Sequence, residues 1–343
     1  MIVTYFRSSS YGCHDMCNFL YTIEYVLGLR GPSGKKAVLG SIVHKGLEFL
    51  ANIKLCQQNG LTTFQDDETN QEFDVGLLTP KQSIDIAFDF YSAKESHHEW
   101  LHKDRKQCHT WLKMCMDLND GMWNPLNRDV VKPEQYFDIP IDEPWAKYKF
   151  TTPEGQVIEG QLAIKGTVDL VTRVSDDTLE YLDWKTGQRL DWATGAVKDY
   201  KKLRSDPQLR IYYYALRKLY PDIANLIMTI VFVRDGGAFA MPFGDEDIPR
   251  TLEMLRKKFE SIKDTVVPRK KVSWRCKAFC HQGRTKWPGS EKTRCDFLHD
   301  EFKKNGLTQL MLNYGTPNVF SSYGDGGGKS NRDEKVVVPT TPA

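Results

Sequence analysis

Apolar and polar residues alternate most clearly between Lys165 and Gly187, where two runs rich in β-branched and aromatic residues flank the polar stretch Ser175 to Asp177. This pattern predicts a β-hairpin. If the turn holds those three residues, Asp169 lies directly opposite Asp183 on the neighbouring strand. Side chains two positions apart on a strand share a face, so Asp183 and Lys185 are expected to point the same way.

Periodicity elsewhere in the chain predicts the elements around this hairpin. Apolar residues at helical spacing predict helices at about 11–27, 38–57, 81–118 (one helix or two), 204–220 and 248–262. Alternating or continuous apolar runs predict strands at about 1–6, 134–141, 157 onward, 226–233 and 238–242, whereas 60–78 and 121–133 are expected to be loop and turn. Strands and helices that alternate in this way predict an α/β fold, with a mixed central sheet flanked by helices.

The composition of the 343 residues, 40% hydrophobic and 27% charged, is that of an ordinary soluble protein. We expect a single domain over 1–315, with a helical insertion at about 60–120 and a cysteine-containing region at 267–300. The stretch 316–343 is rich in Gly, Ser, Pro and charge and is expected to be a flexible tail. The chain opens without a signal-peptide pattern, and its longest apolar run is too short to span a bilayer, so we expect a cytoplasmic protein without a membrane partner.

The two acidic residues of the hairpin carry the strongest chemical signal. Two carboxylates held opposite each other repel unless a cation lies between them, which predicts a divalent metal with hard oxygen ligands. The ammonium of Lys185 beside them could hold a water molecule or stabilise developing negative charge, a combination suited to metal-assisted hydrolysis of a phosphodiester. The alternative is an Asp-x-Lys on a solvated strand face with a weak ion pair.

Four further residues are candidates for the same site. His44 lies beside the apolar stripe of the helix expected at 38–57, where it is either a metal ligand or a hydrogen-bonded structural residue. Glu134 opens an expected strand and is a third acidic candidate, or an edge residue facing water. Gln208 and Tyr212 share one face of the helix that starts at Asp206 and Pro207, where they contact either the substrate or the protein core.

The cysteines and basic residues near the C-terminus form a second candidate region. Cations and aromatic residues mix from about 267 to 287, which suits a single-stranded nucleic acid because phosphates bind cations and bases stack on rings. Cys276 and Cys280 fall in this segment and Cys295 follows it, and the three predict a metal or cluster site that lacks a local fourth ligand. Cys13 and Cys17, four residues apart near the N-terminus, are either core residues or part of a metal site.

Four histidines and Cys108 in the helical stretch expected at 81–118 are interpreted differently. His97, His98, His102 and His109 do not have the spacing of a tight metal site, so we expect surface or packing residues there. The formal net charge of +2 neither supports nor excludes a nucleic-acid partner, because a basic surface can be confined to one cleft.

The order of the candidate residues along about 8–297 resembles the PD-(D/E)XK nuclease superfamily. The residues that carry this resemblance are His44, Glu134, the segment Gly166 to Asp169, Asp183-Trp184-Lys185, and Gln208 with Tyr212. More narrowly, the chain is similar to the RecB-type branch, which includes CRISPR-adaptation exonucleases and the nuclease domains of recombination helicase-nucleases. The resemblance implies a restriction-endonuclease-like core and a metal-dependent DNA nuclease, an exonuclease rather than an endonuclease, acting in recombination, repair or phage DNA metabolism.

The resemblance also implies a role for each residue. His44, Asp169 and Asp183 would coordinate Mg or Mn, with the Trp184 carbonyl as a further ligand. Lys185 would position the attacking water or stabilise the phosphate. The remaining candidates would act around this centre: Glu134 through water, and Gln208 and Tyr212 by orienting the DNA or Lys185.

The same resemblance supplies a fourth cysteine for the C-terminal region. Cys17 would join Cys276, Cys280 and Cys295 around a [4Fe-4S] cluster. The sequence departs from the family in having Asn18 after Cys17, where proline is usual, and in the long spacing from Cys280 to Cys295. Zinc instead of the cluster, or Cys13 instead of Cys17, therefore remains an alternative.

Two other functions fit parts of the pattern. One is a non-catalytic DNA-binding or assembly subunit that keeps the nuclease fold and a structural cluster. The other is a structural zinc protein whose hairpin acids are merely solvated. A Walker-type phosphate loop is absent from the sequence, so any unwinding of DNA would come from a partner such as a helicase or another recombination protein.

Overall fold

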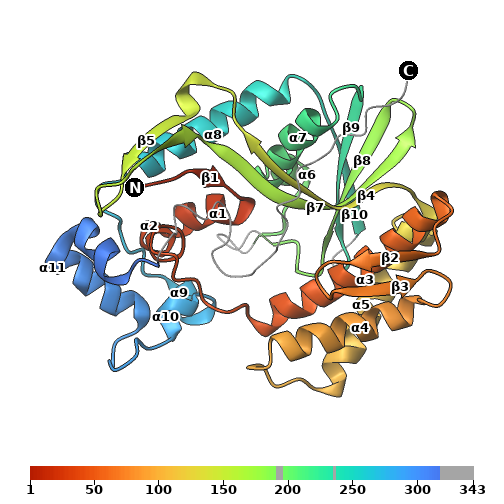
Figure 1. The fold of residues 1–343 in the computed structure, drawn as a ribbon, viewed down its shortest axis with the longest axis horizontal. Helices are drawn as coiled ribbons and strands as arrows, with labels where there is room; N and C mark the ends of the chain where they lie inside the picture. Colours follow the sequence, from red (N-terminus) through yellow and green to blue (C-terminus); the bar gives the residue numbers. More distant parts are fainter. Residues whose placement is uncertain (191–195, 235–236, 317–343) are drawn as a thin grey trace.

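The computed structural model describes residues 1–190, 196–234 and 237–316, so most of the predicted tail lies outside the described residues. Its centre is a six-stranded sheet with the order β1-β7-β8-β9-β10, and β4 pairs with the other edge of β7 (Figure 1). These strands are β1 (Tyr5–Phe6), β4 (Asp129–Pro140), β7 (Ala163–Ser175), β8 (Thr178–Lys185), β9 (Asn225–Phe232) and β10 (Gly237–Phe243). Because β1–β7 and β8–β9 are parallel and the other pairs antiparallel, the sheet is mixed, as predicted.

The central hairpin is formed by β7 and β8. Leu170 pairs with Leu182, so the next step of this register brings Asp169 opposite Asp183, as expected from the sequence. The turn is one residue shorter than predicted, because Ser175 still pairs with Thr178. A register shift between Arg173 and Ser175 absorbs the difference and preserves the pairing of the acids.

Helices cover both faces of the sheet. On one face lie α7 (Pro207–Leu219) and α8 (Asp247–Lys263), and on the other lies α3 (Lys35–Gln58), followed outward by α4 (Pro80–Lys94) and α5 (His102–Gly121) (Figure 1). Strand β8 shows why two cores form: Tyr181 packs into the core of the α7 side, whereas Leu182 and Trp184 pack into the core of the α3 side. Asp183 therefore belongs to the α7 side.

Two regions expected to lack regular structure contain strands. The stretch 60–78 forms a hairpin of β2 (Thr63–Asp66) and β3 (Gln71–Asp74), and β4 begins within the predicted turn, after the 3-10 helix η2 (Pro125–Asn127). The strand expected to run from 157 into the hairpin is also divided, because β6 (Val157–Gln161) pairs with β5 (Lys147–Thr151), after the 3-10 helix η3 (Pro144–Ala146), and not with the central sheet.

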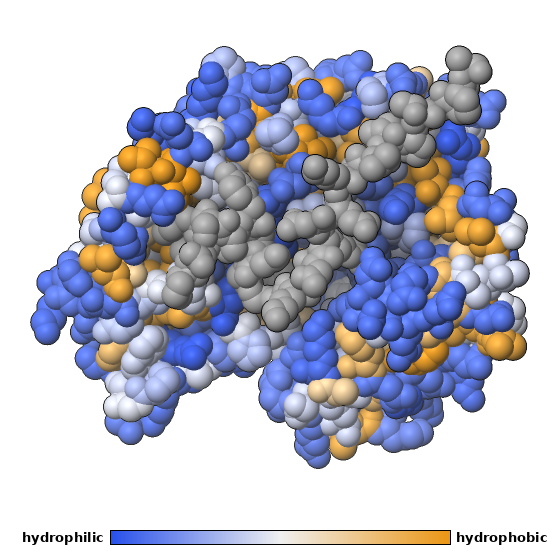
Figure 2. Space-filling model, viewed as in Figure 1, coloured by the Kyte–Doolittle hydropathy of each residue, from blue (hydrophilic) through white to orange (hydrophobic). Residues whose placement is uncertain are grey.

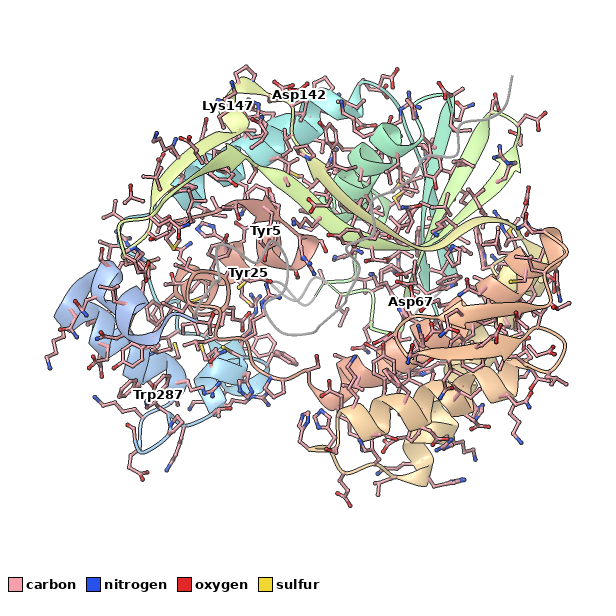
Figure 3. All side chains as sticks on the ribbon, in the orientation of Figure 1. Tyr5, Tyr25, Asp67, Asp142, Lys147 and Trp287 are labelled. Atoms are coloured by element: carbon pink, nitrogen blue, oxygen red, sulfur yellow. The ribbon has the colours of Figure 1, made fainter. Side chains whose placement is uncertain are left out.

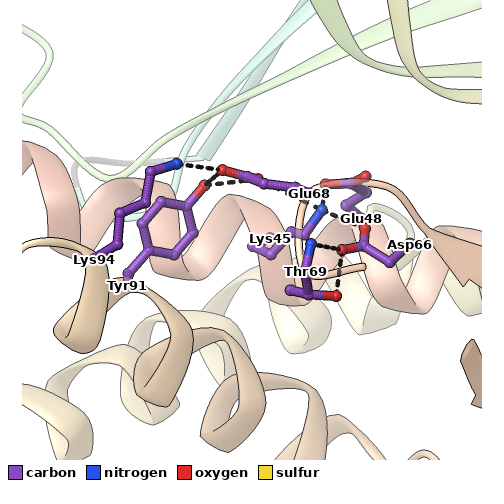
Figure 4. A network of polar contacts seen from close by, with 7 residues as sticks. All are labelled: Lys45, Glu48, Asp66, Glu68, Thr69, Tyr91 and Lys94. Carbon is purple, nitrogen blue, oxygen red and sulfur yellow. Dashed lines mark hydrogen bonds and ion pairs between the residues drawn. The ribbon is translucent and has the colours of Figure 1, made fainter. Parts of the chain in front are cut away.

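A buried lysine fixes the β2–β3 hairpin to the helices. Lys45 of α3 contacts both Glu48 on its own helix and Asp66 at the end of β2 (Figure 4). Glu68, in the turn that follows, accepts hydrogen bonds from Tyr91 and Lys94 of α4. These ion pairs and hydrogen bonds act together with Phe64 and Phe73, whose rings pack against Phe49 of α3, to hold the hairpin on the helices.

The N-terminal helix expected at 11–27 is wrong as a single element. It divides into α1 (Ser8–Met16), α2 (Asn18–Tyr21) and the π-helix η1 (Thr22–Val26). The break is at Cys17, whose backbone is extended, with φ −164° and ψ 115°. Gly28 ends the segment with a positive φ of 74°, in the position expected from the sequence.

The two ends of the chain pack together. Phe19, Ile23 and Leu27 form one small core with Cys295, Leu298 and Leu310 of α11 (Arg294–Tyr314). Two short helices, α9 (Trp274–Ala278) and α10 (His281–Arg284), precede α11 in the region expected to be irregular. Tyr25 and Trp287 mark these N-terminal and C-terminal parts on the same side of the molecule (Figure 3).

The helix expected at 204–220 is α7, which begins at Pro207 with Asp206 as its N-cap, as predicted, and the short helix α6 (Tyr200–Arg204) precedes it. Hydrophilic residues cover most of the face seen in Figure 2, with apolar residues in separate patches. None of the described helices is both long and apolar enough to cross a membrane.

Candidate functional site

Asp169 lies where strands β7 and β8 separate. Its Oδ2 accepts a hydrogen bond from the backbone N–H of Trp184 at 2.9 Å. The same oxygen lies 3.3 Å from Nδ1 of His44, which reaches the sheet from α3. The structure therefore places His44 next to Asp169, which two ligands of the same metal ion would need.

Asp183 is the buried centre of a second set of contacts. It is 1% exposed, and Nζ of Lys185 lies 2.8 Å from its Oδ1 and 2.6 Å from its Oδ2. Nε2 of Gln208, from α7, donates a hydrogen bond to Oδ1 at 2.9 Å. Gln208 can reach the strand because Asp206 caps the start of α7 by accepting from the Gln208 backbone N–H.

Tyr212 lies one helical turn after Gln208 and packs beneath these groups. Its ring meets those of Phe137 and Tyr181 edge to face, at centroid distances of 5.4 Å and 5.5 Å. Burial raises the pKa of Tyr212 to about 12, so its hydroxyl stays protonated, and it interacts with Ser8 at the start of α1. Tyr212 is thus placed to support the site from the core.

Glycine at position 166 is required by this packing. A Cβ atom there would lie 2.7 Å from Cζ of Phe137 and 3.2 Å from Cε1 of Tyr212. The glycine of the Gly166 to Asp169 segment is therefore explained by a close approach of two rings, which the sequence alone did not indicate.

Glu134 occupies an unusual backbone conformation beside Asp169. The neighbouring pairs Pro133–Leu170 and Gln135–Val168 place it next to Asp169 across the ladder. Its φ is +44°, which is uncommon for a residue other than glycine. Its charge contributes to the raised pKa of Tyr91 on α4, so its surroundings include the α4 side of the molecule.

The charges at the site shift one another's pKa. Burial raises the pKa of Asp183, and the charge of Asp169 adds to this, against the effect of Lys185. Burial also opposes ionisation of Asp169, but His44, Lys185 and the Trp184 N–H outweigh it and lower its pKa. The two carboxylates are thus pushed apart in pKa, as expected for coupled acids that share one site.

The two basic groups respond in the opposite sense. Burial alone would lower the pKa of Lys185, but Asp183 and Asp169 outweigh it and raise that pKa, so the side chain stays a cation. For His44, burial is likewise outweighed by Asp169, and its pKa is raised. Two carboxylates, an imidazole and a nearby carbonyl form a donor set that suits Mg or Mn.

The four predicted cluster cysteines gather from both ends of the chain. Burial raises the pKa of Cys295 to about 12, with further contributions from Cys17 and Cys280, and Cys276 contributes to the raised pKa of Cys280. The backbone N–H of Lys271 donates to Sγ of Cys17 at 3.4 Å.

The alternatives for this region also have a structural basis. Cys13 interacts with Cys17 and Cys280 and so lies beside the same group. Zinc held by sulfur at about 2.3 Å would need sulfur atoms about 3.8 Å apart. Within the part of the chain that the structure describes, the residue groups whose ligand atoms lie within 4.8 Å of one another include no cysteine.

A cavity of about 770 Å³ was missed from the sequence; Cys13 and Cys280 line it, whereas Asp169, Asp183 and Lys185 do not. Its lining includes Ser8, Tyr25, Lys198, Lys202, Pro207 and Arg275. The available signal was the basic run just before Asp206 and Pro207, which includes Lys198, Lys202 and Arg204.

The sequence analysis also missed Asp247 of α8, which is fully buried. One of its carboxylate oxygens lies 3.0 Å from Nη2 of Arg204 and the other 3.6 Å from Nη1 of Arg210, so Asp247 connects α8 to α6 and α7.

Of three comparisons with known proteins, one shows the family. No curated protein matches the chain significantly. Among solved structures, a protein of Eubacterium rectale that is named a candidate exonuclease is similar, with 10% identity, a TM-score of 0.45, and coverage of 82% of this chain and 88% of the other. Residues 9–282 match the family model of the PD-(D/E)XK nuclease superfamily. The chain therefore belongs to the PD-(D/E)XK nuclease superfamily.

Proposed function

We propose that this nuclease hydrolyses DNA with a divalent metal, Mg or Mn, held by Asp169, Asp183 and His44 with the Trp184 carbonyl as a further ligand. One observation carries the proposal: the two carboxylates lie on neighbouring strands, and each has its own polar partners. Asp169 contacts His44 and the Trp184 N–H, and Asp183 contacts Lys185 and Gln208. A bound metal ion would supply an activated water and would neutralise charge on the phosphate.

The protein's own groups would do the rest. Lys185 stays cationic and lies at the mouth of the site with its side chain one-third exposed, so it can stabilise the negative charge of the phosphate. Gln208 holds the orientation of Asp183, and Tyr212 supports Gln208 and Lys185 from the core. Glu134 would act through water from its position next to Asp169.

The cavity supports single-stranded DNA or a duplex end as the substrate, and an exonuclease mode. Its volume lies in the range of pockets that enclose small ligands, which suits a few nucleotides of an unpaired strand or of a frayed duplex end. Its cations Lys198, Lys202 and Arg275 outnumber the carboxylates Glu24 and Asp206, and burial raises the pKa of Glu24.

Exposed aromatic residues extend the cavity on its C-terminal side. Trp274 and Phe279 are 58% and 57% exposed and lie edge to face at 5.3 Å. Unpaired bases stack on such rings, and phosphates bind neighbouring cations such as Arg275. Ser8 and Pro207 line the cavity on the side of the proposed centre, because Ser8 interacts with Tyr212 and Pro207 precedes Gln208 in the chain.

For the cysteines we propose a [4Fe-4S] cluster held by Cys17, Cys276, Cys280 and Cys295, with a structural role in joining the two ends of the chain. Anaerobically purified protein should be brown, with the visible absorbance of an iron–sulfur cluster. Cys280→Ser should lose this absorbance and Cys56→Ser, a buried thiol in α3, should keep it. A colourless protein containing zinc would overturn the cluster.

The test of function is cleavage of end-labelled single-stranded and duplex DNA with Mg or Mn, against chelator. Asp183→Asn and Lys185→Ala should each lower the rate at least about 100-fold while remaining folded. Asp176→Asn, on the tip of the same hairpin, should cleave normally, and the product ladder gives the polarity. If the wild-type protein binds DNA but never cleaves it, the alternative function holds: the chain is a non-catalytic assembly subunit that works with a helicase or a recombination protein.

A further inference from the structure

A second group of metal-ligating side chains lies in the loop between α4 and α5. One ligand atom each from Glu95, His97 and His98 lies within 4.8 Å of the other two. Among the described residues this is the one group of three or more His, Cys, Asp or Glu side chains gathered so closely. The sequence indicated surface histidines here, because the carboxylate partner is not apparent from histidine spacing.

One histidine makes a hydrogen bond through the ring nitrogen that would not bind the metal, as metal-bound imidazoles usually do. Nε2 of His98 lies 2.9 Å from the backbone carbonyl oxygen of Ser33 and donates to it. That hydrogen bond fixes the tautomer and leaves Nδ1 with the lone pair that a metal needs. Nδ1 of His97 lies 3.5 Å from Oε2 of Glu95, and the two imidazole rings are 4.0 Å apart.

The loop backbone is fixed independently of any ion. Glu95 donates its N–H to the Tyr91 carbonyl at 2.9 Å, which ends α4. Its own carbonyl accepts from the His98 N–H and from Nε1 of Trp100, both at 3.1 Å. Trp100 in turn packs edge to face against Phe88 at 5.5 Å. The three ligand positions are therefore held on an ordered backbone, which lowers the entropic cost of binding an ion.

Neighbouring cations are engaged by other groups. Lys35 contacts Asp104 and the Glu99 carbonyl, and Lys94 contacts Glu68. Their charges are thus balanced outside the histidine pair, so they do not exclude a metal ion from it.

We propose that Glu95, His97 and His98 bind a divalent transition-metal ion of the zinc, cobalt or nickel class, with a water molecule completing the coordination. Two imidazoles and one carboxylate suit these ions better than magnesium or calcium, which prefer oxygen ligands. Because His98 is bonded to Ser33, the ion would fix the α4–α5 loop to the segment that leads into α3. The site shares no residue with the catalytic centre.

The test is titration of the full chain with Co²⁺, followed by absorbance and calorimetry. Sulfur-bound cobalt absorbs strongly in the near ultraviolet and cobalt bound by nitrogen and oxygen does not, so binding at the cysteines is distinguished. Wild-type protein should bind one more equivalent than His97→Ala, and Glu95→Gln should weaken that equivalent at least about tenfold. His102→Ala, an exposed histidine at the start of α5, should bind as wild type.

Zn²⁺ should also raise the melting temperature of the wild type more than that of His97→Ala. His97→Ala keeps the Ser33 contact of His98, so a folding defect is not expected to confuse the comparison. Equal stoichiometry in wild type and both loop variants, or an equal shift in melting temperature, would overturn the site.

Discussion

The side-chain amide of Gln208 donates a hydrogen bond to Oδ1 of Asp183 at 2.9 Å, which ties α7 to the strand that carries both Asp183 and Lys185. Gln208→Ala removes this bond, so the Asp183 carboxylate keeps Lys185 but loses its fixed amide partner. We expect the cleavage rate at saturating metal to fall about 10- to 100-fold, because a misoriented ligand weakens the centre without removing it. Steady-state kinetics of DNA cleavage at several metal concentrations measures the effect.

Two further variants test whether the effect comes from this hydrogen bond: Gln208→Glu changes the charge of the side chain, and Lys218→Ala is a control on the same helix. Glutamate keeps the length of the side chain but places a third carboxylate beside Asp183, so it should be no better than alanine. Lys218 is exposed on the same helix and should tolerate alanine with normal cleavage. If Gln208→Ala cleaves DNA like the wild type, Gln208 does not position Asp183.

A Cβ atom at position 166 would enter the contact between Phe137 and Tyr212. Gly166→Ala should therefore destabilise the protein by about 1–3 kcal/mol, the usual cost of overpacking a core. Urea unfolding followed by circular dichroism measures the change. Gly12→Ala in α1, where nothing lies within 4 Å of a Cβ, should be neutral or slightly stabilising. A Gly166→Ala variant as stable as Gly12→Ala would mean that the rings move aside without cost.

The amino-acid pattern was sufficient for elements held by local rules. The register of Asp169 and Asp183 follows from strand alternation, and the start of α7 follows from Asp206 and Pro207, whose capping geometry needs no distant partner. The contact of Gln208 with Asp183 was not predicted, because it depends on how α7 packs on the sheet. The residues that the structure brings to this centre are largely those that local pattern could place.

The predictions that failed depend on contacts between distant residues. The chain breaks its N-terminal helix at Cys17, where the Phe19 N–H bonds to the Arg269 carbonyl and the Lys271 N–H bonds to the cysteine sulfur, more than two hundred residues away. The β2–β3 hairpin has few apolar residues, and it packs on α3 through Phe49 and through the ion pair of Lys45 with Asp66. Local periodicity does not contain this information.

Lys45 is 1% exposed in its side chain, and its partner Asp66 is 2% exposed. Lys45→Met would leave the Asp66 carboxylate buried without its cation, so we expect a loss of roughly 3–5 kcal/mol in the free energy of unfolding. The double variant Lys45→Met/Asp66→Asn should recover part of the loss, because it removes the buried charge. Chemical denaturation of both variants, with the exposed Lys36→Met as control, decides whether the ion pair is responsible.

The last prediction concerns His14, which is buried beside Tyr21 and accepts a hydrogen bond from Nδ2 of Asn18 at its Nε2. Burial, together with the nearby charge of Lys258, lowers the pKa of His14 from 6.5 to about 4. The folded state therefore binds fewer protons than the unfolded state between these two pH values. The contribution of the neutral His14 side chain to the stability of the fold is present above pH 6.5 and is lost as the pH falls toward 4.

His14→Gln removes this titration and should be less stable than the wild type at pH 7. The difference in free energy of unfolding between the two proteins should shrink at pH 5. Protonation of His14 in the unfolded state destabilises only the folded wild type there. Urea unfolding at both pH values measures it, and His102→Gln, an exposed histidine, should follow the wild type throughout. Parallel stability curves for wild type and His14→Gln would show that His14 titrates at its ordinary pKa in the folded protein.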